Sequence, residues 1–209
     1  MSDLVFRTAA FSIPFAGLNA GEFRSEILRK SLHFLIGLSP ALAAFNFPAT
    51  VALLAVGILG YVQMESLRVA GIRVPLVSGL TDMASRPRDR GRFVLGPVTL
   101  GLGALLALVM YPSPAASIAI YALAFGDGFA SLVGRLLGRV RPAFLRGKSL
   151  EGSLACFAAV LASAYGVSRD YRVALVAAVT ATVTEALPLK DYDNLVLPLV
   201  VGLVASIAL

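Results

Sequence analysis

The sequence predicts an all-α, polytopic integral membrane protein with about seven transmembrane helices. Of its 209 residues, 58% are hydrophobic and only 14% are charged, whereas soluble domains have about 45–50% apolar and about 25% charged residues. The apolar residues form runs near the length of about 20 residues that a helix needs to cross a bilayer. A single soluble core of this size is therefore excluded.

The expected elements follow one another with short connections. Residues 1–28 are expected to form an interfacial segment, because Arg7, Pro14 and Gly17 interrupt the apolar residues there. Residues 29–209 are expected to form one multi-span membrane domain, since no linker or change of composition divides them. The apolar runs within it lie at 31–47, 49–68, 93–111, 115–134, 150–167, 171–189 and 194–209.

The basic residues predict that the N-terminus is inside and the C-terminus outside. Lys and Arg in short loops favour the cytoplasmic side of a membrane. With seven spans, every Lys and Arg except Arg169 and Arg172 falls on that side. Topology thus explains the net charge of +6, and no nucleic-acid partner is expected. The single cysteine, Cys156, excludes an internal disulfide.

The segment that begins at Asp127 has residues suited to phosphate and metal. A carboxylate in a membrane helix is costly and is usually paired or functional. Mg²⁺ commonly binds one or two carboxylates together with water and substrate phosphates. Ala130, Gly134 and Gly138 have the spacing of small residues that pack helices closely. With Asp127 before them and Lys148 after them, a phosphate-lined site is the favoured interpretation.

Gly147, Lys148 and Ser149 are similar to the end of a phosphate-binding P-loop. The earlier glycine of that motif is missing and no strand precedes it, which excludes a soluble P-loop fold. Lys148 can still neutralise phosphate, and Ser149 can donate a hydrogen bond beside the N–H groups of a helix start. Alternatively, Ser149 caps that helix. Glu151 is either a carboxylate favoured by the helix dipole or a metal ligand.

A second acidic group lies between the last two apolar runs. A solvated turn explains this segment well, except for Glu185, which precedes Pro188 on an apolar helix. Asp193 and Asn194 lead directly into the last run, and their carboxylate and amide suit metal or ribose binding. Capping of the last helix is an equally good interpretation of Asp193 and Asn194.

The first apolar run begins with Arg29, Lys30 and His33, the only histidine. The basic pair suits an anchor at the inner face of the membrane. His33 either accepts a proton or orients a phosphate, or it is a hydrogen-bonded bystander. Glu65 and Arg68 have the helical i, i+3 spacing of an ion pair.

Together these segments resemble the CTP-dependent polyprenol kinase family, which includes dolichol kinase, phytol kinase and a CTP-dependent diacylglycerol kinase. The similar blocks occur in the family's order, and the middle block is the one that the family uses for CTP. One departure is Gly147, where many members have a basic residue, with Arg146 as the candidate substitute. The matching residues are Arg29-Lys30-x-x-His33, Glu65-x-x-Arg68, Asp127-x-x-Ala130-x-x-x-Gly134-x-x-x-Gly138, Lys148-Ser149-x-Glu151-Gly152-Ser153, Glu185-x-x-Pro188 and Asp193-Asn194-Leu195-x-x-Pro198.

The resemblance implies an enzyme of the cell (inner) membrane that transfers the γ-phosphoryl group of CTP, with Mg²⁺, to the hydroxyl of a long-chain isoprenoid alcohol at the cytoplasmic face. Residues 29–209 are then its catalytic domain. The expected catalytic residues are Asp127, Lys148, Glu185, Asp193 and His33, with either Glu185 or His33 accepting the hydroxyl proton. The expected metal ligands are Asp127, Glu151 and Asp193. The expected nucleotide-binding residues are Gly134, Arg135, Gly138, Arg139, Lys148, Ser149, Glu151, Gly152 and Asn194.

Other functions remain as alternatives at this point. A CTP-dependent diacylglycerol kinase differs only in the acceptor. The phosphatidate cytidylyltransferases have a similar nucleotide block, but the absence of any histidine after His33 disfavours them. A small lipid or ion carrier is the non-enzyme alternative, although the paired broken helices expected of a carrier are not evident.

Overall fold

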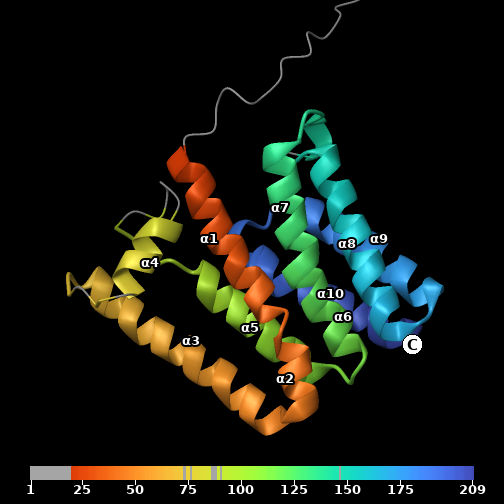
Figure 1. The fold of residues 1–209 in the computed structure, drawn as a ribbon, viewed down its shortest axis with the longest axis horizontal. Helices are drawn as coiled ribbons and strands as arrows, with labels where there is room; N and C mark the ends of the chain where they lie inside the picture. Colours follow the sequence, from red (N-terminus) through yellow and green to blue (C-terminus); the bar gives the residue numbers. More distant parts are fainter. Residues whose placement is uncertain (1–19, 73, 76, 86–88, 90, 146) are drawn as a thin grey trace, which may run out of the picture.

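A computed structural model describes residues 20–209 except residues 73, 76, 86–88, 90 and 146. All regular elements in this part of the chain are helices (Figure 1), which confirms the all-α prediction. Most of the expected interfacial segment lies outside the described residues, as do Arg7, Arg73, Arg86, Arg88, Arg90 and Arg146. The main helices are α1 (Ala20–Ile36), α2 (Ser39–Phe45), α3 (Phe47–Val69), α4 (Val77–Ala84), α5 (Gly96–Met110), α6 (Ala115–Tyr121), α7 (Asp127–Leu136), α8 (Leu150–Ser168), α9 (Tyr171–Ala186) and α10 (Asp193–Ala208).

Four helical stretches among the described residues are long and apolar enough to cross a membrane: Phe47–Val69, Ala115–Leu136, Leu150–Ser168 and Lys190–Ala208. The chain therefore has the long apolar helices of a membrane protein. Of the other three expected spans, 93–111 and 171–189 correspond to the shorter α5 and α9. The remaining one, 31–47, is divided between α1 and α2, because the chain bends at Gly37 and Leu38 before α2 begins.

Helix α6 lies between two apolar cores. One core contains Ile118 and Ala122 with side chains from α8, α9 and α10. The other contains Ala119 and Ile120 with side chains from α5, and Ile36 of α1 packs against it. A π-helical turn over Ala122–Gly126 joins α6 to α7 and ends directly before Asp127. Such turns are frequent at functional sites, because they change the direction in which the following side chains point.

Helices α7 and α8 approach each other closely through the small residues noted in the sequence. A Cβ atom added to Gly152 would lie 2.7 Å from the carbonyl oxygen of Ala130 and 3.2 Å from Cα of Gly134. The close approach at Gly152 therefore requires glycine, and α8 packs here against Ala130 and Gly134 of α7, as the small-residue spacing indicated.

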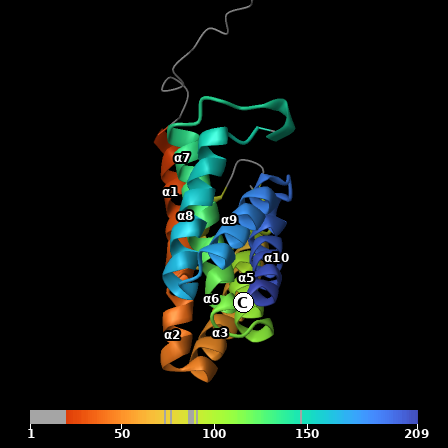
Figure 2. The ribbon, with the colours of Figure 1, turned by 90° about the vertical axis from the view of Figure 1, so that its right-hand side faces the viewer.

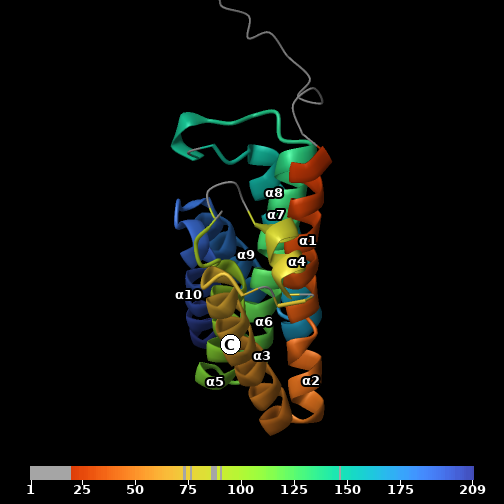
Figure 3. The same cartoon turned by 90° about the vertical axis from the view of Figure 1, so that its left-hand side faces the viewer.

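One end of the bundle gathers the segments that carry the candidate residues. Figures 2 and 3 show that α1 and α8 begin at this end, where α7 also ends, and that the loop between α7 and α8 lies over it. The connection from α9 to α10 lies toward the same end (Figure 2). The described residues thus bring the start of the first apolar run, the middle block and the second acidic group to one region of the protein.

Candidate functional site

Two cavities meet at this end of the bundle. A polar cavity of about 610 Å³ lies among α1, α7, α8, α9 and the start of α10. A mainly apolar cavity of about 680 Å³ lies among α1, α2, α3 and α5. Among the described residues, the side chains that line both cavities are all charged: Lys30, Asp127, Lys190 and Asp193.

Asp127 is the centre of this shared wall. Only 6% of the residue is exposed, and its Oδ2 atom forms an ion pair with the ammonium of Lys30. Nδ1 of His33 lies 3.1 Å from the same oxygen and 3.4 Å from the carbonyl oxygen of Leu123. Since a buried charge is costly without a partner, Lys30 stabilises Asp127 and links α1 to α7.

The surroundings of His33 assign its tautomer. Both atoms near Nδ1, a carboxylate oxygen and a carbonyl oxygen, only accept hydrogen bonds. Nδ1 therefore carries a proton, and when the imidazole is neutral its Nε2 atom is the acceptor. Among the described lining residues, His33 belongs to the apolar cavity and Glu185 to the polar cavity.

A second ion pair fixes Lys148 in the polar cavity. Its Nζ atom lies 2.7 Å from Oε1 of Glu185 and also donates to the carbonyl oxygen of Glu185. This contact ties the loop before α8 to the end of α9. It holds the ammonium of Lys148 at the wall of the polar cavity, where an anion can meet it.

Ser149 begins α8 beside the same cavity. Its Oγ atom accepts a hydrogen bond from the backbone N–H of Gly152 at 3.1 Å, which confirms the capping interpretation. A Cβ atom added to Gly138 would clash with the carbonyl oxygen of Gly134 and lie 2.7 Å from Cβ of Ser149. Gly134, Gly138 and Gly152 all line the cavity, so the close packing of α7 and α8 also brings backbone to its surface.

Three predicted site residues point elsewhere. Glu151 accepts hydrogen bonds from the backbone N–H groups of Arg139 and Val140, at 2.9 and 3.1 Å, and so fixes the loop after α7. Arg139 itself is exposed. The amide of Asn194 donates to Oγ1 of Thr99 at 3.2 Å, and Asn194 lines the apolar cavity rather than the polar one. These contacts give Glu151 and Asn194 structural roles.

The structure also adds residues that the sequence reasoning missed. Glu26 is 2% exposed and forms ion pairs with Arg29 and with Arg135, the latter at 3.0 Å. Arg141 donates to the carbonyl oxygens of Gly147 and Gly134 at 2.6 and 2.9 Å. The i, i+3 spacing of Glu26 and Arg29 was the only available signal for Glu26. The long-range contact to Arg135 has no signature in the sequence.

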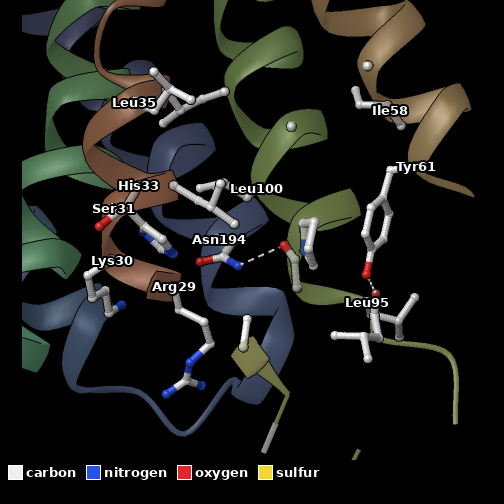
Figure 4. Close-up of a pocket in the computed structure, with 18 of the residues that line it drawn as sticks. Arg29, Lys30, Ser31, His33, Leu35, Ile58, Tyr61, Leu95, Leu100 and Asn194 are labelled. Carbon is white, nitrogen blue, oxygen red and sulfur yellow. Dashed lines mark hydrogen bonds between the residues drawn. The ribbon is translucent and has the colours of Figure 1, made fainter. Parts of the chain in front are cut away.

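The apolar cavity has a polar end and an apolar end. Figure 4 shows Arg29, Lys30 and His33 toward one end, and Leu35 and Ile58 toward the other. Leu35 and also Leu53, on α3, line the cavity while each is 62% exposed. The cavity is therefore open at the surface between α1 and α3, on a side that is covered with exposed apolar residues.

Glu65 and Arg68 hold the far wall of the apolar cavity. Their predicted ion pair is confirmed, with Nη2 of Arg68 2.7 Å from Oε1 of the fully buried Glu65. The same carboxylate oxygen accepts a hydrogen bond from the backbone N–H of Val94 at 2.8 Å. Tyr61 donates to the carbonyl oxygen of Val94 at 3.2 Å (Figure 4). Helix α3 is thus fastened to the segment before α5.

Binding of Mg²⁺ at this site requires phosphate oxygens of a substrate as additional ligands. The described residues contain no group of three or more His, Cys, Asp and Glu side chains arranged to hold a metal ion. Asp127 and Asp193 do line the same two cavities, and the described contacts of Asp127 use Oδ2. Since Mg²⁺ is often held by one or two carboxylates plus substrate phosphates, these two residues fit it; Glu151 does not join them.

The known proteins to which this chain is similar include kinases of lipid alcohols. The chain is 27% identical to the probable phytol kinase 2, chloroplastic, of Oryza sativa, over 90% of this chain and 67% of the relative. It is 31% identical to the farnesol kinase, chloroplastic, of Arabidopsis thaliana, over 64% of this chain and 45% of the relative. It is 32% identical to the CTP-dependent diacylglycerol kinase 1 of Eremothecium gossypii, over 48% of this chain and 32% of the relative.

The matches cover different shares of the relatives' lengths. The chain spans about two thirds of the length of the phytol kinases that it matches. No family model matches the chain, and no solved structure matches it. The chain is homologous to phytol, farnesol and CTP-dependent diacylglycerol kinases, as the resemblance to the CTP-dependent polyprenol kinase family predicted.

Proposed function

We propose that this protein is a membrane lipid kinase that transfers the γ-phosphoryl group of CTP to the hydroxyl of an isoprenoid-type lipid alcohol. The observation that carries the proposal is the meeting of a polar and an apolar cavity at Lys30, Asp127, Lys190 and Asp193. A soluble phosphate donor and a lipid acceptor need separate compartments with one common boundary. The shared charged wall supplies that boundary.

The polar cavity is the proposed nucleotide site. Phosphoryl transfer depends mainly on positioning and on neutralising phosphate charge. Lys148, held by Glu185, supplies a positive charge, and Arg135 and Arg141 line the same space. The start of α8 at Ser149 adds backbone N–H groups and the positive end of a helix dipole, which favour phosphate.

The apolar cavity is the proposed acceptor site. Its surface opening beside Leu35 and Leu53 admits the tail from the bilayer, and its polar end places the hydroxyl near His33. His33 is therefore better placed than Glu185 to accept the hydroxyl proton, which would pass to Nε2. The hydroxyl oxygen then bonds to the γ-phosphorus, the bond from that phosphorus to the β-bridging oxygen breaks, and CDP leaves.

Asp127 and Asp193 are the proposed carboxylate contacts of Mg²⁺, which neutralises charge on the transferred phosphoryl group when it is bound. Lys30 keeps the carboxylate of Asp127 at the shared wall through its contact with Oδ2. The positioning of Asp127 thus depends on α1 as well as on the π-helical turn that precedes α7.

The proposed membrane placement has seven spans, the N-terminus inside and the site at the cytoplasmic face of the cell membrane. The segments that carry the candidate residues gather at one end of the bundle, which supports a single functional face (Figure 2). The positive-inside distribution of basic residues supports the cytoplasm as the side of that face. Cysteine labelling from either side of sealed vesicles tests this placement.

Labelled CTP tests the reaction. Full-length protein in detergent with Mg²⁺ is supplied with CTP labelled at the α or the γ phosphate, and with phytol, farnesol, a long polyprenol, diacylglycerol or phosphatidate. We expect γ label in an isoprenoid alcohol. Label only in diacylglycerol would identify the alternative lipid kinase, and transfer of the α label to phosphatidate would identify a cytidylyltransferase. No transfer to any acceptor would contradict the proposal.

A further inference from the structure

A buried carboxylate on α1 borders the polar cavity, in a place where a negative charge is unfavourable for phosphate. Glu26 is 2% exposed and lines the polar cavity but not, among the described residues, the apolar one. Like charges repel one another, and the burial of an unpaired carboxylate is costly. Glu26 can therefore favour an anion in this cavity only through the cations that it holds.

One oxygen of Glu26 holds two arginines. Its Oε2 atom forms ion pairs with Nη2 of Arg29, one turn further along α1, and with Nη2 of Arg135 at 3.0 Å. Arg135 lies in the last turn of α7, and α1 begins where α7 ends, so the two helices bring Glu26 and Arg135 together (Figure 3). Because two guanidinium groups share one carboxylate, the three side chains keep a net positive charge.

Of the two arginines, Arg135 is the one that lines the polar cavity. It does so together with Lys148 and Ser149, whereas Arg29 is among the residues that line the apolar cavity. The side chain of Arg135 is 37% exposed and thus partly accessible beside its ion pair. A guanidinium suits a phosphate ligand, because its planar fork of N–H donors matches the spacing of phosphate oxygens.

The contact with Glu26 removes a cost that an unrestrained arginine imposes on binding. A long side chain at the end of a helix has many rotamers, and fixing it when a ligand binds costs free energy. The buried carboxylate holds the guanidinium of Arg135 in place before the ligand arrives. Such preorganisation of one side chain changes affinity by on the order of tenfold.

We propose that Glu26 is a positioning residue of the nucleotide site, which presents the guanidinium of Arg135 to the phosphates of the bound nucleotide. This proposal rests on the proposed function in one respect, that a nucleoside triphosphate occupies the polar cavity. The direction of one effect separates positioning from simple charge repulsion. If Glu26 acted only through its own charge, Glu26→Gln would tighten phosphate binding, whereas positioning requires that the same substitution weakens it.

Equilibrium binding of radiolabelled CTP to the full-length protein, with Mg²⁺ and without acceptor, tests this role. Glu26→Gln should raise the dissociation constant by on the order of tenfold. The dissociation constant of inorganic triphosphate, measured by displacement of CTP, should rise by the same factor, because Arg135 contacts phosphate. In steady-state kinetics the loss should appear in KM for CTP rather than in kcat, since a contact fixed before reaction stabilises substrate and transition state alike. Tighter or unchanged binding would overturn the proposal.

A double-mutant cycle shows whether Glu26 acts through Arg135. Arg135→Gln should weaken CTP binding by on the order of tenfold, and Glu26→Gln should then have little further effect. Arg139→Gln is the matched control background, because it removes the same charge from an exposed residue that does not line the polar cavity. There Glu26→Gln should keep its full effect. Additive losses in the Arg135→Gln background would overturn the role of Glu26.

Arg135→Gln also tests the proposal by itself, should Glu26→Gln fail to fold. It leaves the ion pair of Glu26 with Arg29 in place and changes a partly exposed side chain. Wild-type affinity for CTP and inorganic triphosphate in this variant would overturn the proposal.

The outcomes separate this inference from the kinase proposal. Non-additive losses of CTP binding in the cycle, together with no γ transfer to any lipid, would retain the role of Glu26 and refute the kinase. Transfer from CTP to a lipid alcohol, with additive losses in the cycle, would retain the kinase and refute that role. A wild type that binds neither CTP nor inorganic triphosphate would overturn the inference.

Discussion

Replacing Gly138 by alanine is expected to push the end of α7 away from the start of α8. The new Cβ atom would lie 2.1 Å from the carbonyl oxygen of Gly134 and 2.5 Å from Oγ of Ser149, whereas ordinary contacts begin at 3.4 Å. The end of α7 must therefore change and Oγ of Ser149 must move by about 0.9 Å. Overpacking of this kind typically costs about 1–3 kcal/mol. A displacement near 1 Å at a reacting site costs about 10²-fold in rate, so kcat/KM for CTP should fall by about 10- to 100-fold.

Two measurements on the same variant check this expectation. Steady-state kinetics should show the loss in kcat/KM for CTP with little change in KM for the lipid, because the apolar cavity is built from other helices. Thermal unfolding in detergent should show a lower midpoint. Gly60→Ala is the control, because nothing lies within 4 Å of a Cβ atom at that position. Wild-type kinetics with CTP in Gly138→Ala would refute the placement of the nucleotide beside Ser149.

Three further predictions concern the shared wall and the apolar cavity. Asp127→Asn should abolish γ transfer and reduce stability by up to about 3–5 kcal/mol, because Lys30 loses its buried partner; full activity would exclude Asp127 as a metal contact. His33→Gln should lower kcat by about 10²–10⁴-fold with both KM values retained, as expected for loss of a proton acceptor, and an unchanged kcat would exclude that role. Gly57→Phe should raise KM for the lipid alcohol but not for CTP, because Gly57 lines the apolar cavity with open space above it. Gly60→Phe on the same helix should leave both KM values unchanged, and equal effects of the two variants would contradict the acceptor site.

Local features of the fold were predictable from the sequence. The long apolar runs predicted α3, α8 and α10 with ends close to those observed, because a helix with so few charged residues, all near its ends, is long and apolar enough to cross a membrane. The capping by Ser149 and the ion pair of Glu65 with Arg68 followed from short spacings. These features depend on neighbours within one helical turn.

The division of 31–47 into α1 and α2 was not predicted. Gly37 packs against Ala124 and Phe125 of the π-helical turn, where a Cβ atom would come within 3.1 Å of Ala124 Cβ. The break therefore reflects a contact with a segment far away in the chain. Hydropathy alone treats the glycine as one more apolar residue within a continuous span.

The sequence also did not predict which charged side chains of the site form ion pairs with one another. Asp127 and Lys148 were recognised as candidates, but their pairing with Lys30 and Glu185 brings together residues far apart in the chain. Glu151 had the residue type of a metal ligand, yet the N–H groups of the loop after α7 take its carboxylate. Residue type indicates what a side chain can bind, whereas the fold decides which candidate is left free to do so.

The two cavities have a consequence for the order of events in a catalytic cycle. The apolar cavity opens at the surface beside Leu35 and Leu53, and the polar cavity is lined in part by Gly138, Arg141 and Gly147 of the loop between α7 and α8. A lipid and a nucleotide would therefore arrive from different directions, and neither would block the path of the other. Such an arrangement imposes no fixed sequence of substrate binding or product release, so initial-rate kinetics should follow a random-order ternary-complex pattern rather than a ping-pong one.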